Sequence, residues 1–216
     1  MASQVAAATA SAWVFRLAYL ALQRATLLRR HGIDSPAFLS RYVSCLHAGA
    51  LVALGFLWEA GLAAPDWWTP LARAIPIGYL VHDAHLICTE PSLWELSAVA
   101  HHVIFALLVY AAAGAYPNHT ARAFLAELSV FPLNLGWAMI KTGAESRWPR
   151  VFIVNSAALL LTFLRFRVYT FTLFAFEAVA QKVWPLLPML AGLAGLNWYW
   201  FGLLCRKAYA VAQRTA

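Results

Sequence analysis

The stretch SAVAHHVIFALLVY, residues 97–110, places two adjacent histidines inside an apolar run. The run belongs to a segment of roughly 96–115, which is long enough for a helix to cross the hydrocarbon layer of a membrane. Ionisable side chains are unfavourable in hydrocarbon and usually face a protein interior or a polar cavity. We therefore expect His101 and His102 to face other polar groups in a membrane helix bundle.

The composition is that of a membrane protein. Hydrophobic residues make up 62% of the chain and charged residues 12%, whereas soluble domains are nearer half apolar and a quarter charged. The net charge of +7 is best explained by Lys and Arg marking one membrane face, so we expect no nucleic-acid partner. The dispersed cysteines predict neither a disulfide nor a metal site.

Apolar segments predict an all-α, polytopic bundle of about seven transmembrane helices, with an N-terminal helix in residues 1–28. Arg16 and Arg24 lie within or after the apolar part of that helix and no basic region precedes it, which is against a signal peptide. A helix lying on the membrane surface stays an alternative there. The other predicted segments are 41–61, 70–89, 96–115, 119–140, 149–174 and 184–208.

Polar side chains occur in each of the six later segments. Glu127 and Asn134 are seven residues apart and share a helix face, and buried Glu127 requires a partner, for which Arg165 or Arg167 is available. One of these arginines could instead reach the interface with its long side chain. The candidate substrate-binding residues are His47, Tyr79, His82, Asp83, Glu127, Asn134, Arg165, Arg167 and Asn197.

His101 and His102 are the candidate catalytic residues. A neutral imidazole can accept a proton from an alcohol or amine, or attack an acyl carbonyl, and a neighbouring aspartate can fix its tautomer. The pair His82-Asp83 fits a structural role as well as a functional one, and a lone His47 is more often a hydrogen-bonding group between helices. The histidines are too few for a di-iron hydroxylase site, so we expect no metal and no cofactor.

Several short motifs, in order and spacing, resemble the TLC domain, the membrane module of ceramide synthases, translocon-associated TRAM proteins and small TLC-domain-containing proteins. They cover about 41–210: RYVSCLH at 41–47, GYLVHD at 78–83, WEL at 94–96 before the histidine pair, ELSVFPLN at 127–134, FLRFR at 163–167 and LNWYWF at 196–201. The resemblance implies six core helices around a central cavity, a role in lipid metabolism and an endomembrane location such as the endoplasmic reticulum, with the plasma membrane as an alternative.

The resemblance also implies two functions that stay open, besides a weaker third role as a partner of a translocon or lipid enzyme. One is binding or regulation of membrane lipids. The other is acyl-CoA-dependent N-acylation of a sphingoid amine, which makes ceramide, with long-chain acyl-CoA as a partner, because His101 and His102 match the paired histidines of ceramide synthases. Those enzymes carry a second His-Asp pair roughly where this chain has Glu127 to Pro132, and Glu-Leu-Ser there is what the small TLC-domain proteins show.

Overall fold

The computed structural model describes residues 2–25, 33 and 35–215. These residues form helices joined by short turns, with no strand among them, which confirms the predicted all-α membrane fold. The chain divides into two compact units, the first ending at Phe124 and the second beginning at Leu125.

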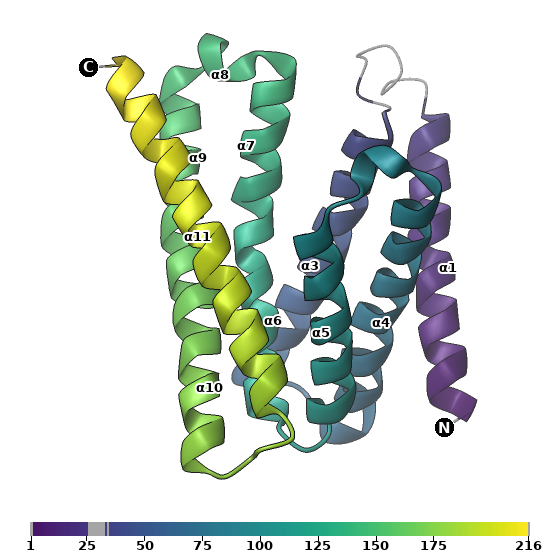
Figure 1. Ribbon diagram of the computed structural model, residues 1–216. Helices are drawn as coiled ribbons and strands as arrows, with labels where there is room; N and C mark the ends of the chain where they lie inside the picture. The colour runs from purple at the N-terminus through teal and green to yellow at the C-terminus, as the bar shows by residue number, and fades with distance from the viewer. Residues whose placement is uncertain (1, 26–32, 34, 216) are drawn as a thin grey trace. The chain divides into compact units, whose positions relative to one another are not determined.

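In the first unit, α4 is the element that joins the others. It packs against α1, α3 and α5, and Figure 1 shows it between α1 and α5. Side chains that are completely buried in this unit include Leu39, Val43, Leu51 and Trp68. The helices are α1 (Ala2–Arg24), α3 (Pro36–Glu59), α4 (Pro65–Thr89), the short η1 (Pro91–Leu93), α5 (Leu96–Ala112) and α6 (Pro117–Leu125).

In the second unit, α11 crosses the long helical rod formed by α9, η3 and α10, and it contacts all three (Figure 1). The short segment η2 packs against η3, and α7 packs against α9. The elements are η2 (Ala126–Ser129), α7 (Val130–Thr142), α8 (Ala144–Arg147), α9 (Pro149–Thr162), η3 (Phe163–Tyr169), α10 (Thr170–Ala180) and α11 (Leu187–Thr215).

Each of the seven predicted apolar segments corresponds to a helix or a run of helices in the described residues. By length and composition, five of them are candidate membrane spans: Ser3–Arg24, Pro36–Glu59, Pro117–Thr142, Pro149–Ala180 and Leu187–Ala210. The predicted segment 96–115 is the shorter apolar helix Leu96–Ala112, and 70–89 is part of α4. Residues 26–28 of the predicted N-terminal helix lie outside the described residues.

Prolines mark several helix starts. Proline lacks an N–H and has a fixed φ, so it fits the first turn of a helix, and α3, α4 and α9 each have one there. The predicted segment starting at residue 70 begins too late, because α4 starts at Pro65 and includes Pro70 and Pro76. Proline inside a helix is tolerated in membrane bundles, where neighbouring groups satisfy the exposed carbonyls.

Helices α1 and α4 approach very closely at Gly78. A Cβ atom placed on Gly78 would lie 2.5 Å from the Cβ of Ser11 and 2.7 Å from the backbone nitrogen of Ala12. Glycine is therefore required at this contact, because any larger residue would push the two helices apart.

Candidate functional site

The first polar cluster is built on α4 and α5. Asp83 Oδ2 on α4 lies 3.1 Å from Nδ1 of His102 on α5, and Asp83 is nearly buried whereas 23% of the His102 side chain is exposed. The Tyr79 side chain, one helical turn before Asp83, is a further hydrogen-bonding neighbour of its carboxyl group. A carboxylate in this position orients the imidazole and sets which of its nitrogens carries the proton.

Aromatic contacts fix the α3 side of this cluster. The ring of His47 on α3 stacks on Tyr79 with centroids 4.0 Å apart and an interplanar angle of 9°. Phe15 on α1 meets the edges of both rings, at 6.0 Å from His47 and 5.5 Å from Tyr79. The Tyr79 ring also lies edge-on to His102, with centroids 6.3 Å apart. These contacts bring His47, Tyr79, Asp83 and His102 together.

The other two candidate site histidines, His101 and His82, point elsewhere. The His101 ring stacks on Phe105 one turn later in α5, with centroids 5.7 Å apart, because adjacent helical residues diverge by about 100°. His82 is 97% buried beside Tyr19 of α1, and neither ring nitrogen has a hydrogen-bond partner among the described residues. The sequence suggested a pair between His82 and Asp83, but Asp83 pairs with His102 instead.

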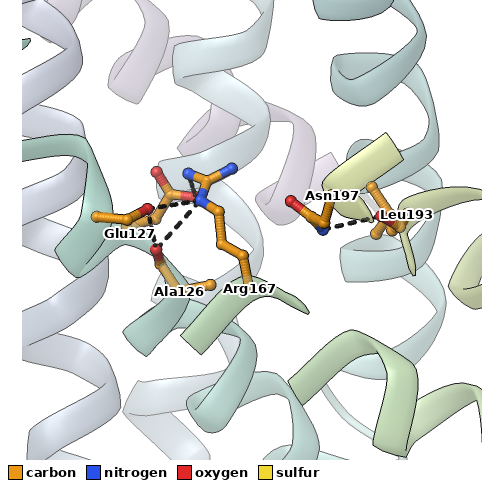
Figure 2. Close-up of polar contacts among 6 residues, drawn as sticks. Ala126, Glu127, Arg167, Leu193 and Asn197 are labelled. Carbon is orange, nitrogen blue, oxygen red and sulfur yellow. Dashed lines mark hydrogen bonds and ion pairs between the residues drawn. The ribbon is translucent and has the colours of Figure 1, made fainter. Parts of the chain in front are cut away.

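The second polar cluster joins η2 to η3. Arg167 Nη2 donates to Glu127 Oε1 at 3.0 Å, and Arg167 Nε donates to Ser129 Oγ at 2.7 Å and to the Ala126 carbonyl at 3.3 Å (Figure 2). Glu127, Ser129 and Arg167 are all buried. Of the two candidate arginines, Arg167 is therefore the partner of Glu127.

Both segments that form this cluster depart from α-helical geometry. In the 3₁₀ segment η2, residues three apart eclipse each other, so Ser129 Oγ can donate to the Ala126 carbonyl at 2.9 Å. Segment η3 is a π-helix, a form that is rare and frequently marks functional sites. Arg165 and Arg167 are two residues apart and point to nearly opposite sides of η3, so Arg165 is exposed and stacks over Tyr169 at 5.0 Å.

Three asparagines lie buried in the second unit. Asn155 Nδ2 donates to the Pro132 carbonyl at 2.8 Å, which ties α9 to α7. Asn197 is completely buried, and its Nδ2 donates to the Leu193 carbonyl at 2.8 Å within α11. Figure 2 shows the Asn197 side-chain oxygen turned to the side on which Arg167 lies, and this oxygen has no hydrogen-bond partner among the described residues. Asn134 is buried on α7.

The TLC domain family model matches residues 37–206, most of the chain. The chain belongs to the TLC domain family. No curated protein and no solved structure matches it. The family match and the apolar helices together show an integral membrane protein. A closer likeness to the small TLC-domain-containing proteins than to ceramide synthases stays a prediction.

Helix α1 precedes the residues matched by the TLC domain, yet it completes the first cluster. Phe15 and Tyr19 are its buried aromatic residues, and they contact His47, Tyr79 and His82. The sequence reasoning missed both residues, although their spacing of four places them on one helix face and could have indicated it. It also omitted Ser129 from the site residues, although Ser129 follows Glu127 by two residues in the Glu-Leu-Ser motif.

Six of the predicted site residues thus fall into two clusters within this TLC domain protein. His47, Tyr79, Asp83 and His102 lie together in the first unit, and Glu127 and Arg167 lie together in the second. Convergence of all of them on one pocket stays a prediction. In the described part of the chain, no group of three or more His, Cys, Asp or Glu side chains is placed to hold a metal ion.

Proposed function

We propose that this TLC domain protein binds a membrane lipid by its polar headgroup at the His102–Asp83 pair. The observation that carries the proposal is the contact of 3.1 Å between Asp83 Oδ2 and His102 Nδ1, in which the carboxylate is shielded and the imidazole is partly accessible. An imidazole so held presents its Nε2 edge in a defined orientation, as a partner for a hydroxyl or amine.

The surroundings of the pair support a lipid as the ligand. Val103, Leu107 and Tyr110 on α5 are each more than half exposed, and such a surface suits acyl chains. Ionisable residues inside membrane helices commonly mark substrate or ion pathways. A lipid fits both the polar pair and the apolar surface, with its headgroup at His102 and its tail along the apolar face of α5.

The cluster of Arg167 and Glu127 has a different role in this proposal. Its charged groups are buried and satisfy each other and Ser129, so it holds η2 against η3 and fixes the second unit. A direct contact of Glu127 or Arg167 with a headgroup would require breaking this network, which a buried ion pair opposes strongly.

The test is lipid retention by the purified chain. The full chain is purified in a mild detergent, bound lipid is extracted, and the lipid species per protein are measured by mass spectrometry. We expect defined species at a constant ratio, lost in His102→Gln and kept in His85→Gln, since His85 is an exposed histidine on the same helix α4 as Asp83. Lipid levels that are the same in both variants would contradict the proposal.

A second candidate function, N-acyl transfer, is favoured by the same pair. A histidine oriented by a carboxylate is the usual arrangement of a general base. Here the amine nitrogen would attack the thioester carbonyl of a long-chain acyl-CoA while His102 takes the amine proton. A C–N bond forms, the C–S bond breaks, and the CoA thiolate leaves and takes up that proton.

The acyl-transfer candidate has its own assay. Labelled long-chain acyl-CoA is incubated with the purified chain and a panel of long-chain amines, and amide product is measured. Turnover that is abolished by His102→Ala supports an enzyme. Retained lipid without any amide product supports binding alone.

A further inference from the structure

By helix length, Arg165 falls in the part of its helix that would cross the hydrocarbon. It is near the middle of the 32-residue candidate span Pro149–Ala180. A helix of this length is roughly 48 Å long at about 1.5 Å per residue, whereas the hydrocarbon layer is only about 30 Å thick. Arg165 is about 24 Å from the Pro149 end, so any 30 Å section of the helix that lies in the hydrocarbon includes it.

The charge of Arg165 is not neutralised within the described residues. No carboxylate forms an ion pair with it there, unlike Arg167, which pairs with Glu127. Its guanidinium lies over the rings of Phe166 and Tyr169, at 5.5 and 5.0 Å from their centroids. An exposed guanidinium in hydrocarbon is unfavourable, and an anion that pairs with it would relieve that cost.

An apolar groove shares the Tyr169 side chain with this guanidinium. Its volume is about 330 Å³, and Tyr169, over which Arg165 stacks, forms part of its wall. The Thr172 hydroxyl in the wall accepts a hydrogen bond from the Trp198 indole at 3.1 Å. The remaining lining residues are Leu164, Val168, Leu173 and Phe176.

The groove is about as long as one alkyl chain. Its lining on this helix runs from Leu164 to Phe176, roughly 18 Å along the axis. The Arg165 guanidinium stacks on Tyr169 of its wall, and its planar donors match a carboxylate with two hydrogen bonds. A single-chain acid supplies one alkyl chain for the groove and one carboxylate for the guanidinium.

We propose that Arg165 and the groove lined by Leu164, Val168, Tyr169, Leu173, Phe176 and Trp198 bind a long-chain fatty acid, with its carboxylate on Arg165. This site adds a second lipid to the one proposed at His102 and does not depend on it. Both of its parts, the cation and the groove, come from η3, α10 and α11 of the second unit.

The test is photolabelling of the full chain in detergent with a palmitic acid that carries a diazirine on its chain. Labelled residues are located by peptide mass spectrometry and are expected within 164–176 or at Trp198. Unlabelled palmitate should compete, whereas hexadecanol, which lacks the charge, should compete about tenfold less well. Equal competition by the alcohol, or labelling confined to other helices, would overturn the proposal without any variant being needed.

Variants with matched controls sharpen the result. Arg165→Gln should lower labelling about tenfold, and Arg206→Gln, which removes an exposed arginine of α11, should not. Leu173→Trp should fill the groove and block labelling, and Leu161→Trp, on the exposed part of α9, should leave it intact. Unchanged labelling in both Arg165→Gln and Leu173→Trp would rule out this site. If labelling is lost in His102→Gln but kept in Arg165→Gln and Leu173→Trp, the fatty acid binds at the first cluster instead.

Discussion

Asp83 on α4 holds the Nδ1 atom of His102 on α5 at 3.1 Å, across a boundary between two helices. The contact gives the histidine pair two different environments, because His101 stacks on Phe105 while His102 faces the carboxylate. In the proposed function, His102 is therefore the histidine of the first cluster that meets the ligand.

Asp83 and His102 should act as one unit in lipid binding. Asp83→Asn removes the charge that orients the imidazole, and His102→Gln removes the imidazole itself. Each change alone should lower lipid retention by about tenfold, and the double variant should lower it no further, since interacting residues are not additive. Retained lipid per protein, measured by mass spectrometry, checks this. Losses that simply multiply would show that the two residues act separately.

The pair of Glu127 and Arg167 should dominate the stability of the second unit. Glu127→Gln leaves the buried guanidinium without its carboxylate, and such a loss destabilises by about 3–5 kcal/mol. Arg167→Lys should also lower stability, because lysine cannot replace the Nε contacts with Ser129 and Ala126. Unfolding in detergent, followed by circular dichroism, measures both effects.

A control for this prediction is Arg165→Lys, on the same π-helix. Arg165 is exposed and pairs with no carboxylate among the described residues, so its change should shift stability by less than about 0.5 kcal/mol. If Arg165→Lys and Arg167→Lys destabilise equally, the buried network does not hold η2 against η3.

Gly78 should be needed for the docking of α1. Gly78→Ala places a methyl group against Ser11 and the backbone of Ala12, and we expect a loss of about 1–3 kcal/mol. Ser11→Gly should relieve only part of this loss, because the backbone atom stays in place. Thermal unfolding of the two single variants and the double variant measures the effect.

Gly202→Ala is the matched control, because a Cβ there meets nothing within 4 Å and alanine favours a helix. It should leave stability unchanged or raise it slightly. A Gly78→Ala protein that is as stable as Gly202→Ala would show that α1 does not pack closely on α4.

Much of the fold followed from sequence because membrane thickness and proline chemistry are local constraints. Apolar length predicted each of the seven apolar segments, and Pro149 stands at a predicted helix start, whereas α4 begins at Pro65, before its predicted start at residue 70. Gly143, which has φ of 70°, ends α7 in the left-handed conformation that glycine favours. The π-helical segment η3 was not predicted, because no residue type or spacing specifies it.

The site was predictable in its residue types and less so in its pairings. Helical spacing places Tyr79 and Asp83 on one face, but it does not say which helix they meet. Helical spacing also places His82 near the face of Tyr79, yet His82 packs beside Tyr19 of α1, whereas Asp83 pairs with His102. Whether Arg165 or Arg167 pairs with Glu127 likewise depends on how η3 is oriented about its own axis, which the sequence does not specify.

The most direct test of the central claim compares lipid retention with thermal stability in the double variant His101→Gln plus His102→Gln. Glutamine keeps a hydrogen-bonding group near Asp83, so the account predicts that retained lipid falls about tenfold while the unfolding midpoint shifts by only about 4 °C or less. Wild-type lipid retention in this variant, or a fall in lipid that only follows a collapse of stability, would contradict a headgroup site at His102.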